Sequence, residues 1–263
     1  MATPYQISIS MNPNTVNALT DGGFSLYGFK GAQTTMKGGM PLVWFQSQKF
    51  SLSTIVTWQE QFQGYTSQSA IVPNGGITAS ASYDMDLGQT LNVTSSAGIG
   101  NVTSGGTQNA LSISNNTTSP FTCGISQMSG SGSAAVATPI CAFPLYGNGL
   151  DVFAPIELVL LSFATTPMNT GTVIAQSFTQ ACLINLTTES EMSVSYDINT
   201  GWDGAGSPNV QLYPAGTSLV PLLLQSSPSL ARRVLAASNV PAHPAAKPQH
   251  PQDSRGNGAL IHA

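Results

Sequence analysis

The chain has 263 residues, enough to bury a substantial core, and only 7% of them are charged, against about 25% in a typical soluble domain. The first 226 residues contain three lysines and ten acids but neither arginine nor histidine, so this part carries a net charge of −7. This composition excludes a nucleic-acid binder, which needs a basic face, and it excludes a histidine-based nucleophile or a common zinc site.

The dominant pattern along the chain is the alternation of apolar and polar residues that is typical of half-buried β-strands. It begins at residues 5–11, where every second residue from Tyr5 to Met11 is apolar. It returns at residues 50–58, where Phe50 and Trp58 lie on one predicted face with Leu52 and Val56. We therefore expect a strand in each segment.

The clearest alternation occupies residues 77–87, and it defines a candidate strand for membrane insertion or assembly. Its apolar residues are Ile77, Ala79, Ala81, Tyr83, Met85 and Leu87. Leu91 and Val93 continue the same pattern beyond Gly88, but a single strand from 77 to 93 would span about 55 Å at about 3.3 Å per residue. Few strands are that long, so we expect a break or bulge near Gly88.

The second half of the body contains further strand patterns. A short strand is expected at residues 111–113, alternation returns at 121–125, and residues 152–163 have the continuous apolar character of a strand buried on both faces. The last clear alternation is at residues 194–198. A helical period is nearly absent, and the one predicted helix is at residues 230–238.

About ten short strands with polar outer faces indicate an all-β fold. We expect an antiparallel two-sheet β-sandwich or jelly roll over residues 1–226. Residues 227–263 are rich in Pro, Ala and His, and we expect a flexible tail that is disordered after its short helix.

The three cysteines, Cys123, Cys141 and Cys182, do not have metal-ligand spacing. Cys123 and Cys141 flank a Gly/Ser-rich stretch and would be able to close a loop in an oxidising compartment. An odd number leaves one cysteine unpaired, and buried free thiols are the favoured interpretation.

Paired carboxylates are the remaining route to catalysis, because glycosidases need only two acids. Asp84 and Asp86 lie two residues apart on one predicted strand, and Glu189 and Glu191 repeat that spacing in a predicted loop. Catalytic acids normally come from different elements that flank a cleft. We therefore interpret these carboxylates as solvated surface groups, predict no catalytic residue, and rank a carboxylate-only hydrolase last among the functions.

The sequence DINTGWDG suggests a weak calcium site, with Asp197, Asn199 and Asp203 as oxygen ligands. It departs from the EF-hand loop because Trp202 stands where that loop requires glycine and the acidic residue at its end is missing. The favoured interpretation is a strand end followed by an Asn-Thr-Gly turn, so we expect no metal site and no effect of calcium on the melting temperature.

Several aromatic residues lie among amides and hydroxyls, a mixture that is typical of sugar-binding surfaces. The candidate binding surface consists of Trp44, Trp58, Tyr65 and Trp202. The competing interpretation, which carries more weight, is that these rings are core residues or cross-strand partners.

Three functions follow from these patterns, and none of them needs a cofactor. The first is a non-catalytic protein that acts by binding or by self-association, with a second copy of itself as the expected partner in a homo-oligomer. The second is a pore-forming, toxin-like protein that inserts residues 77–93 as a membrane hairpin. The third is a lectin-like module that binds glycans.

The start of the chain has neither the basic residues nor the apolar run of a secretory signal, and no stretch approaches the roughly 20 apolar residues of a membrane helix. We therefore expect a cytoplasmic protein or one that is exported without such a signal. The sequence leaves these two alternatives open.

Overall fold

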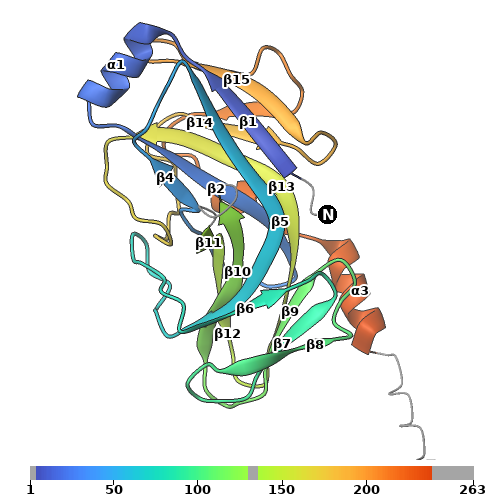
Figure 1. Ribbon diagram of the computed structural model, residues 1–263. Coiled ribbons are helices and arrows are strands. Elements are labelled where there is room, and N and C mark those ends of the chain that lie inside the picture. The colour runs from blue at the N-terminus through green and yellow to red at the C-terminus, as the bar shows by residue number, and fades with distance from the viewer. Residues whose placement is uncertain (1–3, 130–135, 239–263) are drawn as a thin grey trace, which may run out of the picture.

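The computed structural model describes residues 4–129 and 136–238, and this part of the chain is built mainly from strands (Figure 1). The strands form two curled sheets with nine strands each. The predicted all-β, sandwich-like architecture is confirmed at this level.

Each sheet is assembled from segments that are distant in the sequence. The first sheet has the order β16 (Gly201–Asp203), β15 (Glu191–Asp197), β1 (Pro4–Ser10), β5 (Ser53–Ser67), β10 (Phe121–Ser129), β12 (Cys141–Leu145) and β3 (Met40–Pro41), while β6 (Ala81–Met85) pairs with β5 and β11 (Val136–Pro139) with β10. The second sheet has the order β17 (Val210–Tyr213), β14 (Ala181–Asn185), β13 (Leu150–Ala164), β9 (Leu111–Asn115), β7 (Gln89–Val93) and β8 (Gly100–Ser104), while β2 (Ser25–Thr34) pairs with β13, and β4 (Phe45–Ser47) and β18 (Leu224–Ser226) pair with β2.

Both sheets are mixed, which corrects the expectation of purely antiparallel sheets. β1 lies parallel to β15, β7 parallel to β9, and β18 parallel to β2. Alternation of apolar and polar residues is the same in parallel and antiparallel strands, so the sequence pattern located these strands without showing the direction of their partners.

The main core lies between the two sheets, and a second apolar cluster covers the outer face of the second sheet. Leu161 and Phe163 of β13 point into the main core, whereas Leu158 and Leu160 belong to the outer cluster. The predicted burial of residues 152–163 on both faces is confirmed.

The alternating run over residues 77–93 is divided between the sheets, and the strand predicted at residues 77–87 is shorter in the structure, because residues 77–80 belong to no strand. β6 ends at Met85, a turn contains Gly88 with φ of +92°, and β7 begins at Gln89 in the other sheet. The break near Gly88 is confirmed. Of the candidate membrane or assembly residues, Ile77 and Met85 are buried, Ala79, Ala81 and Tyr83 are half-buried, and Leu87 is exposed.

In the described part of the chain, three helices lie outside the sheets: α1 (Pro13–Asp21), α2 (Val220–Leu223) and α3 (Pro228–Ser238). The sequence pattern failed to predict α1. Its start has a recognisable signature, because Asn12 accepts a hydrogen bond from the backbone N–H of Thr15 at 2.8 Å and Pro13 occupies the first turn.

The helix predicted at residues 230–238 is confirmed as α3. Its Leu230 is fully buried against Ala110, Val152 and Ala154, so the packed part of the chain extends past residue 226. The flexible tail predicted beyond this helix lies outside the described residues.

Candidate functional site

The four aromatic residues predicted to form a binding surface are buried in the protein interior. The exposed fraction is 0% for Trp44 and Tyr65, 1% for Trp58 and 3% for Trp202. This corrects the predicted aromatic surface, because a ring without exposed area has no face to offer to a sugar. These rings are core residues, as the competing interpretation expected.

The buried polar ends of three of these rings have defined partners. Trp44 Nε1 donates to the backbone oxygen of Gln127 at 3.1 Å, and Tyr65 donates its hydroxyl to the backbone oxygen of Cys141 at 2.7 Å. Trp58 Nε1 donates to Glu157 Oε2 at 2.9 Å. Trp202 Nε1 is buried without a hydrogen-bond partner among the described residues.

The strongest polar feature of the interior is an ion pair that sequence reasoning missed. Lys30 Nζ contacts Glu157 Oε2 at 2.5 Å, and the Lys30 side chain has no exposed area. Nζ lies 4.7 Å from the ring centroid of Trp58 and 5.6 Å from that of Trp44. Burial lowers the pKa of the Lys30 ammonium. The neighbouring Glu157 acts in the opposite direction, but its effect is smaller.

Glu157 lies at an irregularity in β13. Ile156 pairs with Gly31 of β2, but the next pair joins Val159 to Lys30, so Glu157 and one further residue are additional on β13. Such a bulge re-aims side chains without ending the strand. A sequence signal existed, because Lys30 interrupts an apolar face of β2, but its partner is distant in the sequence.

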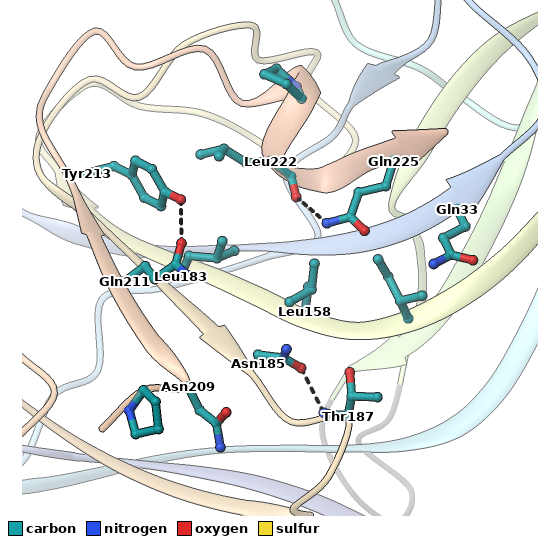
Figure 2. Close-up of a pocket in the computed structure, with 13 residues that line it drawn as sticks. Gln33, Leu158, Leu183, Asn185, Thr187, Asn209, Gln211, Tyr213, Leu222 and Gln225 are labelled. Atoms are coloured by element: carbon teal, nitrogen blue, oxygen red, sulfur yellow. Dashed lines mark hydrogen bonds between the residues drawn. The ribbon is translucent and has the colours of Figure 1, made fainter. Parts of the chain in front are cut away.

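A hollow of about 340 Å³ opens on the outer face of the second sheet (Figure 2). It lies over β2, β13, β14 and β17, beside α2 and β18. Its lining is Gln33, Ile156, Leu158, Leu183, Asn185, Thr187, Pro208, Asn209, Gln211, Tyr213, Pro221, Leu222 and Gln225. Among the described residues, no charged side chain lines it. We call it the amide hollow.

The amide hollow combines an apolar floor with polar walls. Leu158 and Leu183 are almost fully buried and form part of the outer apolar cluster beneath it. Tyr213 donates its hydroxyl to Gln211 Oε1 at 2.6 Å, which fixes the ring and the amide relative to each other. This arrangement suits a neutral ligand that has an apolar face and several hydroxyl groups.

Two further hollows have different chemistry. One, of about 820 Å³, is lined by Glu60, Asp84 and Asp86 together with apolar and amide groups. Asp84 and Asp86 are exposed, and Asp84 accepts a hydrogen bond from Gln63 at 2.8 Å, as in the solvated surface interpretation. The carboxylates of the second predicted pair, Glu189 and Glu191, are also exposed.

The other hollow, of about 620 Å³, lies beside the start of β5 and is lined by Phe45, Phe50 and Ile55 with several hydroxyl groups. Ile55 and its neighbour Leu52 are each 55% exposed. Leu52 therefore does not share a buried face with Trp58, because β5 begins only at Ser53.

The weak calcium candidate forms a turn between β15 and β16. Asp197 Oδ1 accepts from the backbone N–H groups of Asn199 at 2.8 Å and Thr200 at 3.3 Å, and Asp203 accepts from the backbone of Ala205. The bond from Asn199, with a smaller contribution from the bond from Thr200, holds down the pKa of Asp197. Among the described residues, no three His, Cys, Asp or Glu side chains are grouped so that they could hold a metal.

The three cysteines are buried free thiols, as the favoured interpretation expected. Cys123 donates to Asp151 Oδ2 at 3.2 Å. Burial raises the pKa of the Asp151 carboxyl to about 6, while this hydrogen bond has a smaller, opposite effect. Asp151 is thus a second acid inside the core.

None of the helices in the described part of the chain is long and apolar enough to cross a membrane. No protein-family model, curated protein or solved structure matches this chain.

Proposed function

We propose that the protein is a non-catalytic binding module that holds a neutral, hydroxyl-rich ligand of the glycan class in the amide hollow. The observation that carries this proposal is the composition of the lining, which combines five amide side chains, a tyrosine and an apolar floor without a charge. Amides both donate and accept hydrogen bonds, as sugar hydroxyls do.

The size and position of the amide hollow support this function. Its volume of about 340 Å³ falls at the lower end of the range of about 300–1,000 Å³ for small-molecule sites. Asn185 and Gln211 are exposed at its walls, while the leucine floor is held by the packed sheet below. A ligand therefore meets side chains that are accessible but mounted on strands.

A glycan array followed by calorimetry tests the proposal. The protein is expected to bind neutral glycans on the array. The double variant Asn209→Ala/Gln211→Ala is expected to bind them about tenfold more weakly, because each lost hydrogen bond contributes about 0.5–1.5 kcal/mol. Gln48→Ala removes an exposed amide that lines none of the three hollows and is expected to bind like the wild type. An array on which the protein binds no neutral glycan, or a double variant with unchanged affinity, would contradict the proposal.

Self-association is the second candidate function, and the apolar groups beside the start of β5 favour it. Leu52 and Ile55 are large apolar side chains with 55% exposure next to the hollow that contains Phe45 and Phe50. A second copy that covers this surface would remove that apolar area from water. Light scattering at high concentration tests it, and Ile55→Asp is expected to shift the chain toward the monomer. A wild-type protein that stays monomeric would exclude this function.

A further inference from the structure

Lys30 and Glu157 place an amine and a carboxyl group in contact inside the core. Nζ and Oε2 are 2.5 Å apart, and the exposed fraction of the two side chains is 0% and 10%. Neither residue lines any of the three hollows described above. Within the core the two groups contact each other, and Trp58 is a further polar partner of the carboxyl group.

The surroundings favour the uncharged, reactive form of the amine, and the contact between Nζ and Oε2 gives its proton a carboxylate to move to. Burial penalises the ammonium of Lys30, and transfer of one proton from Nζ to the carboxylate converts the ion pair to an amine and a carboxylic acid. Two charges in a dry core lose their hydration, which is costly even when they are paired. A neutral amide would remove both charges.

Trp58 is positioned to assist the reaction of the carboxyl group. Its Nε1–H donates to Oε2 at 2.9 Å, the oxygen that also contacts Lys30. A fixed N–H that points at a carboxyl oxygen stabilises the negative charge that develops when a nucleophile adds to the carbon. Well-oriented intramolecular reactions reach effective molarities of about 10⁵–10⁸ M, so contact inside the core favours reaction between these two groups.

We propose that Lys30 and Glu157 form an intramolecular amide bond that joins β2 to β13. The Nζ lone pair attacks Cδ of Glu157, a C–N bond forms, and one C–O bond of the carboxylic acid breaks. The departing oxygen leaves as water, with the hydroxyl proton of the acid and one proton from the amine. No atom changes oxidation state, so the step needs neither an oxidant nor a reductant.

The bond would tie together two neighbouring strands of the second sheet that are far apart in the sequence. A cross-link that closes a long loop restricts the unfolded chain and so stabilises the folded one. The link does not depend on the amide hollow, which lies on the opposite face of β13. Failure of the glycan experiment would therefore leave this proposal untouched.

The mass of the intact, denatured full chain tests the proposal. The wild type is expected to be lighter than its sequence mass by one water molecule, and trypsin is expected to leave the chain uncut after Lys30, because an acylated lysine is no longer cationic. A wild type with its full sequence mass and normal cleavage after Lys30 would show that the pair is ionic only, and would overturn the proposal.

Two lysine variants locate the missing water. Lys30→Met is expected to have its full sequence mass, whereas the matched control Lys49→Met, which changes an exposed lysine, is expected to keep the deficit. A deficit that survives in Lys30→Met would place the water loss elsewhere and also overturn the proposal. The wild-type measurement decides the matter even if Lys30→Met does not fold.

Discussion

The two faces of β13 use polar groups in opposite ways. The inward face carries the acids Asp151 and Glu157, each held by a specific partner inside the core. The outward face contributes only apolar side chains, Ile156 and Leu158, to the amide hollow, whose polar groups come from neighbouring elements. Inside, polar groups are occupied by one another; outside, they surround a space that a ligand can fill.

The comparison shows that the position of a polar residue, and not its reactivity alone, decides whether it can meet a ligand. Glu157 has chemistry that an enzyme could use, but it is buried beside Lys30 and meets no open cavity described above. The amide hollow is accessible, but its lining has no charged group for acid–base work. The buried acid and the accessible hollow therefore occupy different places in the fold.

Lys30→Met removes the buried partner of Glu157, and we expect it to have the largest effect on stability. The free energy of unfolding should fall by about 3–5 kcal/mol, because Glu157 is left in the core without its partner. Denaturant titration measures the change. The exposed-site control Lys49→Met should stay within about 0.5 kcal/mol of the wild type. Equal stability of the two variants would show that the buried pair contributes nothing.

Asp151→Asn tests the second buried acid through pH. The pKa of Asp151 is raised from 3.8 to about 6, so the folded chain binds this proton more tightly than the unfolded chain does. Its stabilising contribution is therefore complete below about pH 4 and is lost as the pH rises to about 6.

The stability of the wild type relative to Asp151→Asn should thus decrease by roughly 2–3 kcal/mol between pH 4 and pH 7. Thermal or denaturant unfolding of both proteins across this range measures it. Parallel stability curves for the two proteins would show that Asp151 has an ordinary carboxyl.

Two tryptophan variants isolate the hydrogen bond to Glu157. Trp58→Phe and Trp202→Phe both shrink a buried ring, but only Trp58 donates its N–H, whereas Trp202 Nε1 has no partner among the described residues. Trp58→Phe should therefore cost about 1–3 kcal/mol more, because the buried Oε2 of Glu157 loses its donor. Equal losses of stability in denaturant titration would show that the hydrogen bond from Trp58 to Glu157 does not stabilise the protein.

Two variants of Tyr213 test the amide hollow on the outward face, and their expected effect is the smallest. Tyr213→Ala should weaken glycan binding about tenfold, which corresponds to about 1.4 kcal/mol, because an aromatic face is removed from the amide hollow. Tyr213→Phe keeps the ring and loses the bond to Gln211, so its affinity should lie between those of Tyr213→Ala and the wild type. Calorimetry with a retained glycan measures both, and unchanged binding by Tyr213→Ala would exclude the ring from the site.

Local patterns were readable from the sequence where they depend on neighbours along the chain. The alternation from Tyr5 onward, the break near Gly88 and the helix that contains Leu230 are all present in the structure. The start of α1 was also encoded, by Asn12 and Pro13, but its nine residues lack the long apolar period that marks a helix.

The candidate sites were not readable, because they depend on contacts between distant residues. Trp44 and Trp202 have the composition of a sugar-binding surface, and only the packing of the two sheets places them inside the core. The amide hollow collects side chains from β2 to β18, none of which forms a local motif.

By itself, the sequence determined that this protein is built from short strands with polar faces and that its first 226 residues offer no histidine chemistry. The tertiary structure decided the direction of the strands, the burial of the aromatic rings and the meeting of Lys30 with Glu157. The physical reason is that periodicity is a property of neighbouring residues, whereas burial and pairing arise only when distant segments pack against each other.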